Sequence, residues 1–113
     1  MIHIHIRRDG RARRITLEAS GHAGHAPAGQ TLICAAVSSL LYGFAAEVSA
    51  MDPHRFCDGS QIAFGDASGH GRMDLVCRDP YVYRRLIAAL SPIERALEKL
   101  AADAPDELSL SLH

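Results

Sequence analysis

Apolar and polar residues alternate at both ends of the chain. In residues 2–6 three isoleucines are separated by histidines, which is the two-residue period of a strand with one buried face. The period returns in residues 15–19, after Asp9-Gly10, a dipeptide that favours a tight turn because glycine can adopt positive φ. Leucines alternate with serines in residues 108–112. The pattern predicts an N-terminal β-hairpin and a short final strand.

Between these ends, two longer segments have apolar residues at steps of three and four, the period of an amphipathic helix. The first follows Thr31, whose hydroxyl can cap a helix, and should end at Asp52-Pro53 because proline disfavours the α conformation of the residue before it. Its apolar face comprises Ile33, Ala36, Val37, Leu40, Leu41, Phe44, Ala45 and Val48.

The second helical segment covers residues 80–103 and contains two possible helix starts. Asp79-Pro80 and Ser91-Pro92 each resemble an N-cap followed by proline, and Ser91 to Glu94 also fits a capping box. The segment is therefore either one helix kinked near Pro92 or two helices end to end. A single apolar stripe across the proline favours one kinked element.

Residues 54–78 return to the two-residue period around a turn-rich stretch at residues 65–71, which predicts a second hairpin. The expected order is ββαββαβ. The fold class is α+β, a single domain over residues 1–113 in which two helices pack on an antiparallel sheet.

Composition narrows the class of protein. A chain of 113 residues, 48% of them apolar, can bury a core without a metal or disulfide. A net charge of −1 argues against a nucleic-acid partner, and the five arginines in residues 7–14 most simply keep the hairpin soluble. Three widely spaced cysteines indicate thiols in a reducing compartment. With no signal peptide and no apolar run near the ~18 residues that span a bilayer, we expect a cytoplasmic protein without a membrane partner.

The residues with candidate catalytic roles lie in one stretch, Gly21–Leu40. If Thr31 is the N-cap, Cys34 is the third residue of the helix, where unpaired backbone N–H groups and the helix dipole stabilise a thiolate. His22, across the preceding loop, can fold back and accept the thiol proton. Ser38 lies one turn further along the helix and can orient a substrate carbonyl.

Two other interpretations of these residues remain open. Cys34 can be a small buried apolar residue, which is the commoner fate of a helical cysteine. Alternatively, His22, His25 and Cys34 can bind a metal with Cys57 or Cys77, although the spacing matches no compact zinc pattern. The residues themselves do not decide among the three.

The motif resembles a known family. Gly21-His22-Ala23, then Gly29, then Ile33-Cys34-Ala35-Ala36-Val37-Ser38 is similar to the pattern of the ribosomal-processing cysteine proteases called Prp. The expected element order and the closing Ala104–Leu108 extend the resemblance over nearly the full length.

The resemblance implies a small cytoplasmic bacterial endopeptidase, usually a homodimer, that removes a short N-terminal extension from ribosomal large-subunit protein twenty-seven. It implies Cys34 as nucleophile, His22 as general base, and residues 23–30 as a flap over the substrate peptide, with no cofactor or metal. His25 can assist as a base, bind substrate or be a solvated loop residue. The candidate substrate-binding residues are Gly21, Ala23, Gly24, His25, Gly29 and Ser38.

The chain departs from the family pattern at Thr31, where members usually carry aspartate. Threonine preserves the cap but lacks the carboxylate. The alternative function is therefore a catalytically weak or inactive module of the same fold that binds a peptide or the ribosome.

Overall fold

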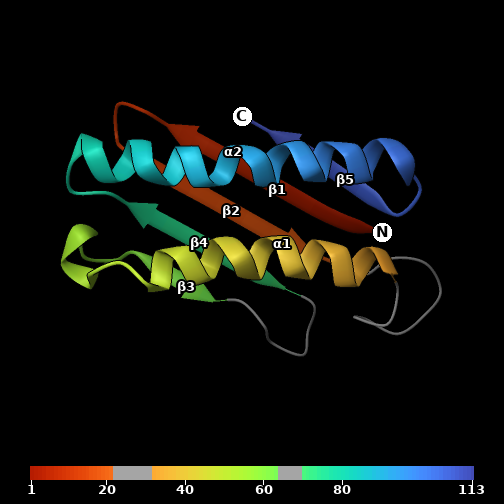
Figure 1. The fold of residues 1–113 in the computed structure, drawn as a ribbon, viewed down its shortest axis with the longest axis horizontal. Coiled ribbons are helices and arrows are strands. Elements are labelled where there is room, and N and C mark those ends of the chain that lie inside the picture. The colour runs from red at the N-terminus through yellow and green to blue at the C-terminus, as the bar shows by residue number, and fades with distance from the viewer. Residues whose placement is uncertain (22–31, 64–69) are drawn as a thin grey trace.

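The structure is a computed structural model that describes residues 1–21, 32–63 and 70–113. Its elements follow the predicted order (Figure 1). They are β1 (Ile2–Asp9), β2 (Arg14–Ser20), α1 (Leu32–Ser49), the 3₁₀ turn η1 (Pro53–Arg55), β3 (Gln61–Ala63), β4 (Gly71–Val76), α2 (Pro80–Asp103) and β5 (Leu108–Leu112). Both predicted hairpins and the final strand are confirmed.

The five strands form one mixed sheet in the order β3-β4-β2-β1-β5. The expectation of a wholly antiparallel sheet was wrong at one pair, because β5 runs parallel to β1. β4 is antiparallel to β2, which is antiparallel to β1, so β4 and β5 point the same way. Parallel strands need a crossover connection, and α2 supplies it. α1 does the same between β2 and β3.

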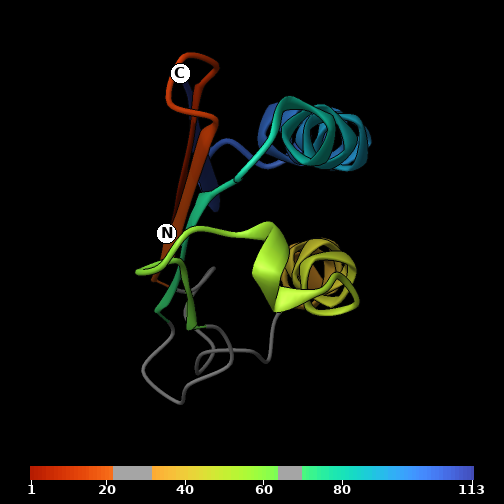
Figure 2. The same ribbon diagram turned by 90° about the vertical axis from the view of Figure 1, so that its left-hand side faces the viewer.

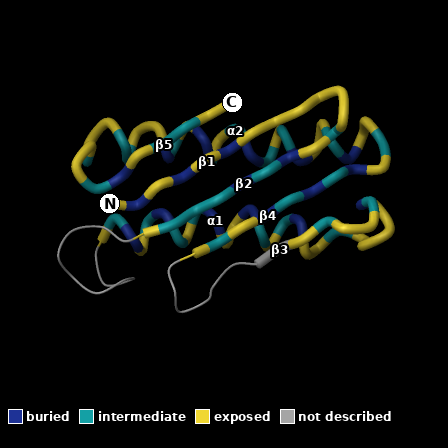
Figure 3. The backbone as a smooth tube through the Cα atoms, turned by 180° about the vertical axis from the view of Figure 1, so that it is seen from behind, coloured by how far each residue is buried: buried dark blue, intermediate teal, exposed yellow. Residues whose placement is uncertain are grey.

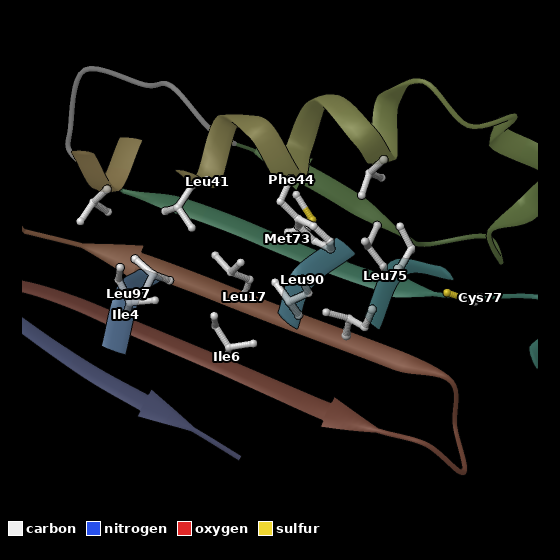
Figure 4. Packing of buried hydrophobic residues seen from close by; sticks show 14 of the residues in the cluster. Ile4, Ile6, Leu17, Leu41, Phe44, Met73, Leu75, Cys77, Leu90 and Leu97 are labelled. Atoms are coloured by element: carbon white, nitrogen blue, oxygen red, sulfur yellow. The ribbon is translucent and has the colours of Figure 1, made fainter. Parts of the chain in front are cut away.

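Both helices lie on the same side of the sheet and leave its other face bare (Figure 2). In β1 the isoleucines face the helices and are buried, whereas His3 and His5 are exposed on the bare face, as the alternation predicts (Figure 3). Between helices and sheet, Leu41 and Phe44 of α1 meet side chains from the strands and from α2 (Figure 4). The largest fully buried side chains are Phe44, Ile4, Ile6, Ile15, Leu17, Met73, Leu75, Leu86, Leu90, Leu97, Leu108 and Val82.

The first turn differs from the predicted Asp9-Gly10 dipeptide. β1 and β2 pair up to Asp9 and Arg14, so four residues connect them. The positive φ falls at Arg13, at +52°, and not at Gly10. Arg13 is held there because its carbonyl accepts a hydrogen bond from the N–H of Cys77 at 2.9 Å and its Nε donates to the carbonyl of Cys77 at 3.2 Å. Asp9 Oδ1 also accepts hydrogen bonds from the N–H groups of Arg11 at 3.1 Å and Ala12 at 3.2 Å, so local contacts and the distant contact with Cys77 together hold this turn.

α1 ends at Ser49, before the predicted Asp52-Pro53. Asp52 instead caps η1 by accepting a hydrogen bond from the N–H of His54 at 2.9 Å. By length and composition alone, the 18 residues of α1 are apolar enough to cross a bilayer, and 28% of them are buried. This is weak evidence for a membrane span, because the core helix of a soluble protein meets the same criterion. Alanine, glycine and serine separate the large apolar residues of α1, so the helix contains no long continuous run of large apolar residues.

α2 is one helix of 24 residues with Pro92 inside it, which confirms a single element over residues 80–103. Asp79 caps it, accepting from the N–H of Val82 at 2.9 Å. The second predicted start is wrong: the hydroxyl of Ser91 donates to the carbonyl of Ile87 at 2.9 Å, within the helix. Pro92 is exposed, so water can satisfy the carbonyl that lacks its helical partner.

Arg8 and Glu94 form an ion pair that the sequence interpretation missed. Glu94 is 3% exposed and pairs with Arg8 instead of serving in the predicted capping box. Glu94 is in phase with Leu90 and Leu97 of α2, and Arg8 is in phase with the buried isoleucines of β1. This phase was the signal that Glu94 points inward and that Arg8, whose side chain is 35% exposed, lies on the helix-covered face of the sheet.

Candidate active site

Cys34 is the third residue of α1, as the predicted helix start requires. Its side chain belongs to the apolar core cluster, and the residue is 6% exposed. Ser38, one turn further along, is half-buried. The structure therefore places the sulfur at the inner side of the first helical turn.

The electrostatic setting of Cys34 favours a thiolate. The first turn of α1 contains no acidic residue, so no carboxylate of that turn opposes the positive end of the helix dipole. N–H groups of the first turn have no partners within the helix and can stabilise negative charge beside them. The burial of Cys34, which is 6% exposed, works against a thiolate, so the helix start is one of two opposing effects at this residue.

Gly21 stands at the end of β2, directly before His22, in a conformation that only glycine accepts readily. Its φ is +88°, and a Cβ built on it would lie 2.2 Å from the carbonyl oxygen of Met1. The close approach of the backbone at Met1 thus fixes the direction in which the chain leaves the sheet. A side chain at this position would displace the segment that leads to His22.

The other sequence-predicted site residues lie outside the described residues. They are His22, Ala23, Gly24, His25, Gly29 and the cap residue Thr31. Of the candidate site, the structure therefore describes Gly21, Cys34 and Ser38. Among the residues that the structure describes, no group of three histidine, cysteine or acidic side chains is placed to hold a metal ion.

The two remaining cysteines occupy a different part of the fold. Cys77 follows β4, forms an isolated antiparallel β-bridge with Phe56 and is fully buried. Burial raises the pKa of the Cys77 thiol to about 11, so that thiol stays protonated at neutral pH. Cys57 is partly exposed next to it. Unlike Cys34, neither lies in the first turn of a helix.

A hollow of about 400 Å³ on the bare face of the sheet was not predicted. The hollow reaches Ser20, the last residue of β2. The lining residues are His3, His5, Glu18, Ala19, Ser20, His70, Gly71 and Arg72. Part of the signal for it was present in the sequence, because His3, His5, Glu18 and Arg72 occupy outward positions of strands whose inward positions are buried.

The described part of the chain is thus a five-stranded mixed sheet covered on one face by two helices, with a cysteine in the first turn of one of them. The family model described as cysteine protease Prp matches residues 1–108, and the chain belongs to that family. The family assignment and the fold class expected from sequence are both confirmed.

Solved structures show the same fold. The ribosomal processing protease Prp from S. aureus, in complex with a substrate peptide, is 18% identical with a TM-score of 0.71, and the similarity covers 100% of both chains. The same protease with a covalently linked product peptide gives the same values. SMU.848 from Streptococcus mutans is 22% identical with a TM-score of 0.63, covering 99% of this chain and 93% of that one. No match was found among curated proteins.

Proposed function

We propose that this chain is a cysteine endopeptidase that removes the N-terminal extension of ribosomal large-subunit protein twenty-seven. The single observation that carries the proposal is the position of Cys34 at the positive end of α1, in a chain of the Prp family. One solved relative of the same fold, the S. aureus protease, holds a substrate peptide in one structure and a covalently linked product peptide in another. A peptide substrate is therefore the natural expectation for this chain too.

In the proposed reaction, His22 accepts the proton of the Cys34 thiol and the sulfur attacks the carbonyl carbon of the scissile peptide bond. Negative charge develops on the carbonyl oxygen, close to the first-turn N–H groups of α1 that can stabilise it. The bond to nitrogen then breaks, and the leaving amine takes the proton from His22. Water, deprotonated by His22, hydrolyses the thioester and restores the thiol.

The burial of Cys34 supports an extended substrate. Because Cys34 as a whole residue is only 6% exposed, there is little room beside it for a folded loop. A flexible N-terminal extension can place its backbone close to the sulfur without unfolding a partner. We therefore propose that Gly21, Ser38 and the loop residues Ala23, Gly24, His25 and Gly29 bind the backbone of that extension.

Substitution of the dyad tests the proposal. Cys34→Ser and His22→Ala should each abolish cleavage of the extended ribosomal protein, followed by mass spectrometry, while the matched control Cys57→Ser should cleave as the wild type does. Wild-type turnover by either dyad variant, with folding verified by circular dichroism, would refute the assigned roles.

A second candidate function, a peptide-binding module without turnover, is favoured by Thr31 alone, because the family carboxylate is missing there. If the carboxylate is catalytic, Thr31→Asp should create cleavage that the wild type lacks. If it only caps the helix, the substitution should leave cleavage unchanged and alter stability by less than about 1 kcal/mol. Efficient turnover by the wild type excludes the binding module.

We further propose that the protein acts in the cytoplasm as a homodimer. Its three cysteines are thiols, without a disulfide, which suits a reducing compartment. The processing of a ribosomal protein also takes place there.

A further inference from the structure

β5 is an edge strand whose outer side is open to a further strand. Among the described strands it pairs with β1 alone and lies at one margin of the sheet (Figure 3). His113 accepts a hydrogen bond from the N–H of Arg8 at 3.0 Å and donates one to the carbonyl of Ile6 at 2.9 Å, so its backbone faces β1. Successive residues of a strand direct their backbone groups to opposite sides. The N–H and C=O groups of Leu110 and Leu112 therefore point away from β1.

This edge lacks the features that normally keep sheet edges from pairing with other chains. Exposed edges are commonly protected by charged side chains, by proline or by being very short. β5 contains no charged residue and no proline, because its five residues alternate leucine and serine. β3, the strand at the opposite margin, has only three residues. β5 is therefore the margin at which this sheet can accept another strand.

A second hollow of about 400 Å³ lies where the end of β5 meets α2. Ser91, Arg95 and Glu98 of α2 line it on one side, and Leu112, which is 37% exposed, lines it on the other. Side chains of a strand alternate between the two faces, so a strand beside β5 would direct every second side chain toward α2 and this hollow. Sheet edges bind peptides by this combination, in which backbone groups give affinity and a pocket accepts alternate side chains.

We propose that β5 binds an extended peptide segment of another protein as a sixth strand of the sheet. The segment carries apolar residues at alternate positions, which lie on the helix-covered side beside Leu110 and Leu112. Its intervening residues are small or polar and lie beside Ser109 and Ser111 on the bare face. At the end of β5, one helix-facing side chain of the segment enters the hollow, where the arginine and the glutamate of α2 favour a polar group.

A second copy of the chain fits this edge less well than a single strand does. Antiparallel pairing of two β5 strands relates the copies by a twofold axis normal to the sheet, which puts both α2 helices on the same side. A helix with its side chains is about 10 Å across. The hollow beside α2 is large enough for side chains and not for a second helix. The proposed site is therefore distinct from an interface between copies.

Selection of peptides, followed by two substitutions at one position, tests the proposal. Peptides are enriched from a random display library, with Cys34→Ser as the target so that no bound peptide is cleaved, and are then synthesised with a fluorophore. Their apolar residues should recur at every second position. Leu112→Pro should weaken their binding by roughly tenfold in fluorescence polarisation, because it removes an outward N–H and leaves a carbonyl of the peptide unpaired.

The matched control is Leu112→Val, because valine is similar to proline in size and keeps the N–H. This variant should bind the selected peptides as the wild type does. Leu112→Pro should still fold, which circular dichroism verifies, because the lost N–H points away from β1 and edge strands tolerate proline.

Amide hydrogen exchange measured by NMR locates the contact on the strand. In the free protein the N–H groups of Ser109 and Ser111, which face β1, should exchange slowly, and those of Leu110 and Leu112 should exchange fast. Bound peptide should slow exchange at Leu110 and Leu112. This pattern of alternate residues distinguishes strand addition from a peptide bound elsewhere on the chain, including at Cys34.

Three results would overturn the proposal. The first is a selection in which every enriched peptide binds Leu112→Pro as tightly as Leu112→Val. The second is exchange at Leu110 and Leu112 that bound peptide leaves unchanged. The third is slow exchange at these two amides in the free protein that increases with protein concentration, because a second copy would then occupy the edge. Cleavage enters none of these measurements, so failure of the proposed function would leave this inference standing.

Discussion

Gly21 and Gly59 form a natural pair for measuring how strongly the end of β2 is held. Both have positive φ, +88° and +90°. A Cβ at Gly21 would overlap the carbonyl oxygen of Met1 at 2.2 Å, whereas a Cβ at Gly59 would meet no described atom within 4 Å. Alanine at either site therefore has the same backbone strain, but only at Gly21 does it also displace a neighbouring strand.

The expected magnitudes follow from these two contributions. A non-glycine residue in the left-handed region costs about 1–2 kcal/mol, which is the whole expected effect of Gly59→Ala. Overpacking that only a backbone shift can relieve adds about 1–3 kcal/mol, so Gly21→Ala should cost about 2–5 kcal/mol. Because both are glycine-to-alanine changes, the loss of entropy in the unfolded chain cancels in the comparison.

Urea denaturation followed by circular dichroism measures both free energies of unfolding. Thermal midpoints should agree, since each 1 kcal/mol shifts the Tm of a domain of this size by about 4 °C. Equal destabilisation of the two variants, within about 0.5 kcal/mol, would refute the reasoning that the contact with Met1 holds the end of β2. The cleavage activities of the two variants should differ too. Gly21→Ala should lose activity under conditions where both variants are folded, because it moves the residue before His22.

Three further predictions concern buried and paired groups. Arg8→Ala should lower the free energy of unfolding by about 2–4 kcal/mol in urea denaturation, because it leaves the buried Glu94 carboxylate without its partner. The double variant Arg8→Met with Glu94→Leu should be close to neutral, and a double variant as unstable as Arg8→Ala would contradict this prediction. Iodoacetamide near pH 6 should alkylate Cys34 much faster than Cys77, because burial raises the pKa of the Cys77 thiol to about 11. Peptide mapping measures the two alkylation rates. Preferential labelling of Cys77 would exclude an activated Cys34. Asp74→Asn should destabilise the protein near pH 7, and the difference from wild type should shrink as pH falls, because an arginine hydrogen bond holds the pKa of the Asp74 carboxyl below its usual value. A difference in stability between Asp74→Asn and wild type that grows as the pH falls would contradict this prediction.

Much of the fold could be predicted because its signals are local. Period-two isoleucines and leucines have one buried face, and helical periods set α1 and α2. The start of α2 at Asp79-Pro80 and the position of Cys34 at the third residue of α1 follow from capping rules within a few residues. These are short-range effects that sequence displays directly.

The predictions that were wrong concern features that depend on residues distant in sequence. Arg13 replaces Gly10 as the positive-φ residue because Cys77, 64 positions later, bonds to it. β5 is parallel to β1 because α2 crosses over the sheet, which no local pattern states. Glu94 faces inward because Arg8, on another element, compensates its charge.

The candidate site also has one part that the local sequence predicts and one part that it does not. The position of Cys34 follows from helix capping. Which side chain lies next to its sulfur depends on how residues 22–31 return from β2 to α1, and those residues lie outside the described ones. No periodicity governs such a loop, so the pairing of His22 with Cys34 stays a prediction.

The pairing of β1 with β5 has a consequence for synthesis. The first strand to leave the ribosome must wait for residues 108–112 before one of its edges acquires a partner. Until those residues have left the exit tunnel, an isoleucine-rich strand has an unpaired edge, a known route to misassociation. The sheet should therefore be completed only after residues 108–112 have emerged, and nascent chains stalled before them should be more susceptible to protease than chains that include them.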